Sequence, residues 1–280
     1  MQAPTRRTPA SDSRAATGSW AAVLSRRRAA VGAVAVLAAA GVGAGWLWRR
    51  FGDAVTWAGD NLLEPRSIEV RGVAPWVRCD IKAEALRAAS LDRGLPLTDP
   101  DLAARLARAF ETHPWVARVQ GVRLSHPPAA VVEVACREPA AMVAVRGGLL
   151  AVDSDSAVLP SADFTAESAA AYPRIVGIES SPRGPEGSRW GDTAVEEGAA
   201  VAAAIGPEWR ALGLVECRPV SEAGMRVWLL VGPAGRTIRF GSAPGRERDG
   251  EPAAAVKLAA LRGLVGQPLP ADGVDLTRAD

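Results

Sequence analysis

The sequence is poor in the residue types that build most catalytic and metal sites. Only two of its 280 residues are histidines, His113 and His126, which argues against a histidine-based metal site or catalytic array. The three cysteines, Cys79, Cys136 and Cys217, are odd in number and far apart, so they cannot form a complete disulfide framework or a CxxC pair. We therefore expect each cysteine to be a small buried side chain rather than a reactive thiol.

The motifs of common enzyme classes are absent as well. The chain contains no GxSxG, no HExxH, no phosphate-binding loop and no dinucleotide-binding glycine pattern. It has no fixed-period repeat, and 48% hydrophobic residues are too many for a disordered chain. We expect a folded, non-enzymatic protein with no metal or organic cofactor. An exported enzyme is a distant alternative, with Cys217 and His113 as its candidate reactive groups.

The net charge of +2 conceals two oppositely charged parts of the chain. Residues 1–50 contain eight arginines and one acid, which gives +7, so residues 51–280 carry −5. A basic head on an acidic body indicates a membrane or nucleic-acid contact at one end. The negative charge of the remainder argues against nucleic-acid binding by that part.

Residues 29–48 are an uncharged run of twenty residues that predicts a transmembrane helix. A helix of this length spans about 30 Å, the thickness of the hydrocarbon core of a bilayer. Basic and aromatic residues flank the run as membrane anchors do: Arg26, Arg27, Arg28, Trp46 and Trp48. Six arginines precede the run and two follow it, so residues 1–28 are predicted to be a disordered cytoplasmic tail and the rest extracytoplasmic.

A cleaved signal peptide is the alternative interpretation of this segment. The sequence Ser25-Arg26-Arg27-Arg28 is similar to a twin-arginine export signal. The hydrophobic region of a signal peptide usually has only about 7–15 residues, so the full spanning length favours an uncleaved anchor. We therefore predict a single-pass protein of the inner membrane.

After a juxtamembrane linker at 49–65, residues 66–137 predict a compact α+β module. A strand is expected at 67–72, a helix from Asp80 to Gly94, and a second helix around 102–110 with Asp99 as its N-cap. Strands are expected at 115–124 and after the turn at 125–128, and Gly121 predicts a β-bulge in the first of them. The order strand, helix, helix, strand, strand places two helices on one face of a three-stranded sheet.

Residues 138–280 predict a second, β-rich domain with two helices. Strands are expected at 149–152, 157–159, 174–177, 212–216, 225–231 and 236–240. Residues 232–235 join the last two strands as a hairpin. One helix is expected at 193–205, with Thr193 and Glu196 as a capping box, and another at 252–262.

Several motifs occur in a distinctive order. The first group is His113-Pro114-Trp115-Val116, Val122-Arg123, Pro127, Val132-Glu133-Val134 and Arg137-Glu138-Pro139-Ala140-Ala141. The second is Val152-Asp153, Val158-Leu159, Tyr172-Pro173-Arg174-Ile175-Val176-Gly177, Ile238-Arg239-Phe240-Gly241, Lys257-Leu258 and Val274-Asp275-Leu276. This ordered set resembles the FtsQ/DivIB family of bacterial cell-division proteins over about residues 25–276.

The resemblance implies an architecture and a function. It implies a POTRA domain at 66–137, a β domain after it, and one anchor with a cytoplasmic amino terminus. The implied function is a non-enzymatic scaffold that recruits later division proteins and binds FtsB/FtsL-like coiled-coil membrane proteins. The alternative is an exported POTRA-containing assembly or transport factor with a cleaved signal peptide.

Three features depart from the family pattern. Gly121 adds a residue, Ser156 stands where the family often has glycine, and only Thr277–Asp280 follow the Asp-Leu motif, where the family continues into a partner-binding strand. We therefore predict that the edge of the 225–240 hairpin binds partners instead. The candidate partner-binding residues are Trp228, Leu230, Arg236, Ile238 and Phe240. For Trp228, a core position is an equally good interpretation.

The junction between the two predicted domains contains a further set of candidates. These are Trp115, Arg137, Glu138 and Pro139. Trp115 is expected to pack in the core of the module. Arg137 and Glu138 are expected to form a structural ion pair or an interdomain hydrogen bond rather than a catalytic site.

Overall fold

The structure is a computed structural model that describes residues 61–268, 270 and 272–278. Residues Asp60–Asp280 form one compact unit with the mixed α+β composition that the sequence predicts. The predicted tail, anchor and most of the linker lie outside the described residues, with the flanking residues Arg26, Arg27, Arg28, Trp46 and Trp48. Among the described residues, no helix combines the length and apolar character needed to cross a membrane.

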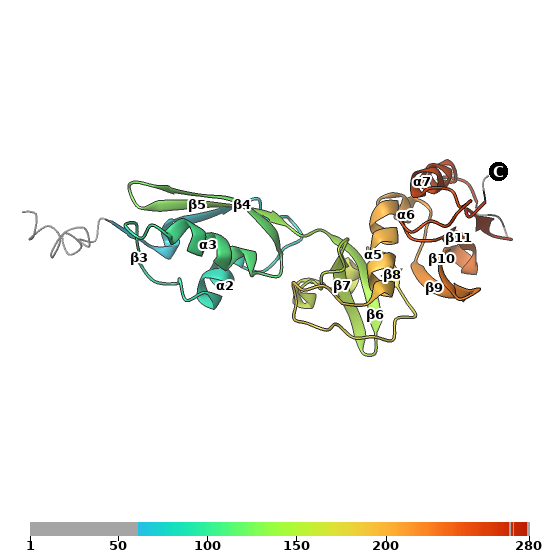
Figure 1. Ribbon diagram of the computed structural model, residues 1–280, viewed down its shortest axis with the longest axis horizontal. Coiled ribbons are helices and arrows are strands. Elements are labelled where there is room, and N and C mark those ends of the chain that lie inside the picture. The colour runs from blue at the N-terminus through green and yellow to red at the C-terminus, as the bar shows by residue number, and fades with distance from the viewer. Residues whose placement is uncertain (1–60, 269, 271, 279–280) are drawn as a thin grey trace, which may run out of the picture. The chain divides into compact units, whose positions relative to one another are not determined.

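A three-stranded sheet and two helices form the amino-terminal half of the described chain (Figure 1). The elements are β2 (Ile68–Arg71), α2 (Ile81–Ala88), α3 (Leu102–Glu111), β4 (Val116–Ser125) and β5 (Ala129–Cys136). The strand order is β2-β5-β4, with β2 parallel and β4 antiparallel to β5. The predicted order of elements is confirmed, and a small sheet that was not predicted pairs β1 (Leu62–Leu63) with β3 (Leu95–Pro96).

Local sequence determines the details of this half. Val119 pairs with Val134 and Gly121 with Glu133, so one residue is skipped and the predicted bulge is confirmed. The prediction of Asp99 as an N-cap is wrong, because α3 has Asp101 as its N-cap. Asp99 accepts a hydrogen bond from the Asp101 N–H at 2.9 Å, which forms a turn before the helix begins.

A seven-stranded mixed sheet forms the second half, with the strand order β12-β11-β10-β9-β8-β6-β7. Its strands are β6 (Pro139–Val145), β7 (Gly148–Asp153), β8 (Arg174–Ile175), β9 (Glu216–Glu222), β10 (Met225–Val231), β11 (Thr237–Gly241) and β12 (Val274–Asp275). Its helices are α4 (Ala166–Ala169), α5 (Thr193–Ile205), α6 (Glu208–Ala211) and α7 (Ala254–Gly263), with α5 packed against β6, β8 and β9.

Most elements predicted for this half are confirmed, and two short strands are not. The helix at 193–205 and the hairpin of β10 and β11 are confirmed. The strand predicted at 212–216 is wrong, because β9 begins at Glu216. In the predicted strand 157–159, only Ala157 and Val158 form β-bridges, and both bridges are isolated.

The strands that sequence analysis missed have physical reasons for their weak signals. Pro219 lies inside β9, but β8 pairs with β9 only at Glu216 and Cys217, so the missing N–H of Pro219 removes no hydrogen bond between β8 and β9.

The predicted capping box of α5 is wrong by one residue, because Asp192 is the N-cap and its side chain accepts a hydrogen bond from the Ala194 N–H at 2.8 Å.

Two clusters of buried side chains hold the unit together. One surrounds α5 and the larger sheet and contains Trp190, Trp209, Trp228 and Phe240. The other surrounds α2, α3 and the smaller sheet, but it also contains Met142, Ala151 and Leu159 from the second half. The predicted domain boundary at 137/138 stays a prediction, and the second core extends across it.

The contact of α5 with the sheet depends on a glycine. A Cβ atom at Gly198 would lie 2.8 Å from Cη2 of Trp228 and 3.1 Å from Cδ1 of Ile175. We expect Gly198→Ala to lower the free energy of unfolding by about 1–3 kcal/mol through overpacking, measured by urea denaturation. Gly263→Ala, at an open position at the end of α7, is the control and should be neutral or slightly stabilising. Equal stability of wild type and Gly198→Ala would contradict the tight packing.

Candidate functional site

The predicted partner-binding side chains lie mostly in the core. Trp228, Leu230, Ile238 and Phe240 are all 0% exposed and belong to the cluster around α5. They stand at alternate positions of β10 and β11, so they point to one face of the sheet, and that face is covered. Their proposed contact with a partner is therefore corrected to a packing role, while Arg236 is half-buried in the loop before β11.

The hairpin is not at the edge of the sheet either, which corrects the second part of that prediction. β10 lies between β9 and β11, and β11 is covered by β12. Val274 pairs in parallel with Ile238 and Asp275 with Arg239, and the Leu276 N–H donates to the Arg239 carbonyl at 2.9 Å. Residues 273–277, which we call the end segment, therefore form this end of the sheet.

Arg239 fixes the end segment to the sheet through its guanidinium group. Its Nη1 donates to Asp275 Oδ2 at 3.0 Å and to Thr277 Oγ1 at 3.1 Å, and its Nη2 pairs with Glu222 on β9. The hydrogen bond with Glu222 raises the pKa of Arg239, and the contacts with Asp275 add to this effect. One side chain thus connects β9, β11 and β12.

Asp275 is charged and well organised at this edge. Burial opposes its ionisation, but the hydrogen bonds from Thr277 and Arg239 together lower the pKa of Asp275 below its ordinary value. In a parallel pair of strands, the backbone of Arg239 bonds to the residues before and after its partner Asp275. The backbone N–H and C=O of Asp275 therefore point away from β11, towards the open edge of the sheet. The Thr277 N–H bonds to Asp275 Oδ1 at 2.9 Å, which limits the open stretch.

A buried ion pair supports β11 from the side of α7. Lys257 is 1% exposed, and its Nζ donates to Glu251 Oε1 at 2.6 Å and to the Ser242 carbonyl at 3.2 Å. The same Nζ lies 4.8 Å from the centre of the Phe240 ring. Burial opposes ionisation of Glu251, yet the hydrogen bonds from Lys257 and Ser242 lower its pKa to about 2.

This depressed pKa makes a pH dependence measurable. The ordinary pKa of Glu251 is 4.5, so its stabilising effect is present above pH 4.5 and is lost as the pH falls towards 2. The full effect corresponds to about 3 kcal/mol. We expect the difference in unfolding free energy between wild type and Glu251→Gln to shrink by about 2 kcal/mol between pH 6 and pH 3 in urea denaturation. The control is Glu111→Gln on α3, at an exposed position, and a difference independent of pH would contradict the ion pair.

The predicted junction residues lie together, as expected. Trp115 is 0% exposed, and its Nε1 donates to Asp163 Oδ2 at 2.6 Å. Arg137 Nη1 donates to Asp153 Oδ2 at 2.7 Å, which is the ion pair that the sequence suggested for Arg137, although with another partner than Glu138. Pro139 is buried at the start of β6, opposite Asp153, and Glu138 is exposed.

Asp153 also stabilises a turn, in addition to its ion pair with Arg137. Its Oδ1 accepts from the N–H groups of Asp155 and Ala157 at 2.9 and 2.7 Å, so it shapes the turn after β7. We expect Asp153→Ala to lower the free energy of unfolding by about 3 kcal/mol, because it leaves the largely buried Arg137 unpaired and the turn unbonded.

A double-mutant cycle isolates the ion pair from the turn. Arg137→Met removes only the ion pair, so its coupling with Asp153→Asn in urea denaturation should be about 1–3 kcal/mol. Arg123 and Glu133, an exposed ion pair between β4 and β5, provide the matched control cycle, with a coupling below about 1 kcal/mol. Equal coupling free energies in the two cycles would show that burial does not strengthen the ion pair between Arg137 and Asp153.

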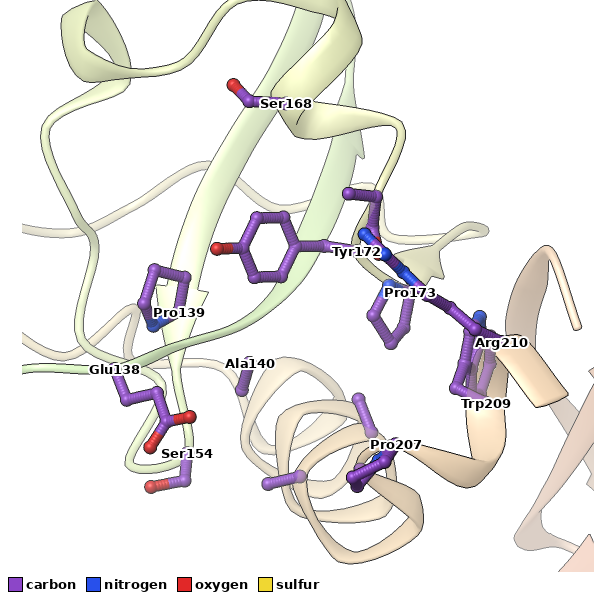
Figure 2. A pocket seen from close by; sticks show the side chains of 14 residues that line it. Glu138, Pro139, Ala140, Ser154, Ser168, Tyr172, Pro173, Pro207, Trp209 and Arg210 are labelled. Atoms are coloured by element: carbon purple, nitrogen blue, oxygen red, sulfur yellow. The ribbon is translucent and has the colours of Figure 1, made fainter. Parts of the chain in front are cut away.

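A cavity of about 620 Å³ lies beside the junction. Figure 2 shows the Tyr172 ring among its lining side chains, with Glu138 and Ser154 on one side and Trp209 and Arg210 on the other. Burial raises the pKa of Tyr172. The three ionisable side chains of the lining are Glu138, Tyr172 and Arg210, and Ser154 and Ser168 add two hydroxyl groups. Sequence analysis missed the cavity because distant segments of the chain line it.

Cys217 does not have the properties of a nucleophile. It is 0% exposed in the core of the larger sheet, and burial raises the pKa of its thiol to about 12, with a further contribution from Glu216. The thiol is therefore protonated at neutral pH. Burial of Cys217 confirms the expectation of a small core side chain, whereas Cys79 and Cys136 are only half-buried.

Comparison of the chain with protein-family models and with curated proteins finds no match.

Proposed function

We propose that this chain is a non-enzymatic, single-pass scaffold of the bacterial cell-division machinery, of the FtsQ/DivIB type. The ordered motifs from His113 to Leu276 support the family, and the order strand, helix, helix, strand, strand in residues 66–137 supports the POTRA domain that the resemblance implies. The β domain then corresponds to the seven-stranded sheet and its helices. The mechanism is binding, so the relevant features are surfaces and edges rather than a catalytic cluster.

The end segment is the observation that supports this function best. It is the last strand of a seven-stranded sheet, and the backbone groups of Asp275 face its open side. An extended segment of a partner can add to such an edge through main-chain hydrogen bonds. Arg239 holds this edge in place before a partner arrives, which reduces the entropic cost of binding.

The predicted topology brings the partners to this edge. In the proposal, residues 1–28 are cytoplasmic, residues 29–48 cross the inner membrane, and the described unit lies outside the cytoplasm. The partners are FtsB/FtsL-like coiled-coil membrane proteins held in the same membrane. Confinement to one membrane raises their effective concentration, so a short binding edge can suffice.

The proposal is tested in the organism that encodes the chain. Depletion of the protein is expected to block septation, and tagged full-length protein is expected to recover short coiled-coil division proteins from detergent-solubilised membranes. Sequencing of the amino terminus of the purified protein distinguishes an uncleaved anchor from the assembly factor with a cleaved signal. Normal septation after depletion, with no division proteins recovered, would overturn the proposal.

A single substitution examines the binding edge itself. Asp275→Pro removes the outward N–H and the side chain, whereas Asp275→Ala removes the side chain alone. Because strand addition needs the N–H, we expect Asp275→Pro to reduce partner recovery about tenfold relative to Asp275→Ala, measured by quantitative co-purification. Equal recovery with the two variants would place the interface elsewhere.

A further inference from the structure

A cluster of metal-ligating side chains lies apart from the end segment and the cavity. Within the described residues, Cys79, Glu84 and His113 place their ligand atoms within 4.8 Å of one another. Cys79 precedes α2, Glu84 is in the first turn of α2, and His113 follows α3, so two helix termini bring the three residues together. Sequence analysis could not find the cluster, since its residues are up to 34 positions apart and match no ligand-spacing motif.

We propose that Cys79, Glu84 and His113 bind one divalent transition-metal ion of the zinc class. Thiolate, imidazole and carboxylate together form a ligand set that suits Zn²⁺. Zinc sites with three protein ligands leave a fourth position open, here for a water molecule. This inference is independent of the proposed division function.

The charges around the cluster favour a cation. Asp163 is 8% exposed and accepts from Trp115 Nε1 at 2.6 Å, while Glu84 lies 3.2 Å from His113 Nε2. Among the described ion pairs, Asp163 has no cationic partner and Glu84 has only His113. Two carboxylates thus lie at a half-buried site where, among the described ion pairs, neither is paired with a lysine or an arginine. A divalent ion would neutralise their negative charge.

The cysteine and the histidine must each change protonation when the ion binds. A thiol must lose its proton to ligate a metal ion, so binding through Cys79 releases one proton to solvent. His113 Nδ1 accepts from the Trp115 N–H at 3.2 Å, which places the proton of the neutral ring on Nε2. Ligation through Nε2 therefore moves that proton to Nδ1 and breaks this hydrogen bond. Because Cys79 releases its proton on ligation, metal binding should strengthen as the pH rises.

Cobalt is the probe, because a cobalt–thiolate bond absorbs in the near ultraviolet. We expect the reduced, metal-free, full-length protein to bind one Co²⁺ per chain with such an absorption band, and Zn²⁺ to displace it. Cys79→Ser should abolish the band, and Glu84→Gln should weaken Co²⁺ binding about tenfold or more. Cys136→Ser and His126→Gln are the matched controls and should bind Co²⁺ as the wild type does.

Glu84→Gln tests the site even if another variant fails to fold. Glu84 has a half-exposed side chain on the surface of α2, so Glu84→Gln preserves the core, and circular dichroism verifies the fold of each variant. Absence of saturable Co²⁺ binding to folded wild type would overturn the proposal. So would a thiolate band that persists in Cys79→Ser, or binding that Glu84→Gln leaves unchanged.

Discussion

The hydrogen bond from Trp115 to Asp163 is a buried polar contact that constrains both halves of the described unit. It joins the end of the helical module to the segment after β7, and both groups are buried. A buried carboxylate is costly unless it is hydrogen-bonded, and a buried indole N–H needs an acceptor, so each group satisfies the other. Phe164, with its ring centre 5.9 Å from that of Trp115, and Tyr172 beyond it extend the contact as an aromatic row.

The Arg137–Asp153 ion pair acts beside this contact and gives the same junction a second connection. Arg137 also receives a hydrogen bond from Trp76 Nε1 at its carbonyl oxygen, at 3.0 Å. Within the described residues, its Nε is buried and has no hydrogen-bond partner, which leaves a polar cost at the junction. Since the core of the smaller sheet also includes residues from β6 and β7, the two halves share buried surface there as well as polar contacts.

Sequence analysis predicted elements where local pattern and tertiary structure agree. The 193–205 helix, the β10–β11 hairpin and the bulge at Gly121 each have a periodicity or a glycine that requires them. Ser156 was noted only as a departure from the family pattern, and its φ of 62° lies in the left-handed region that favours glycine. The resemblance indicated this position without the backbone angle that causes the preference.

The candidate site was less predictable because alternation along a strand identifies two faces but not what covers them. Trp228 and Leu230 alternate with other residues of β10 in a manner that fits either a core face or an exposed interface. Only the packing of α5, through Gly198 against the Trp228 ring, decides between them. β12 has two residues, which is too short for any sequence pattern, so the true end of the sheet could not be found this way.

The short end strand also resolves a conflict between binding and self-association. A long exposed edge would invite pairing between copies of the same chain. Here Asp275 directs its N–H and C=O to the open side, and the Thr277 N–H is occupied by the Asp275 side chain. Because so few main-chain hydrogen bonds are offered, a partner has to supply further contacts of its own or be held nearby. Under the proposed function, a partner confined to the same membrane would meet this condition, whereas the edge offers few hydrogen bonds to a freely diffusing strand.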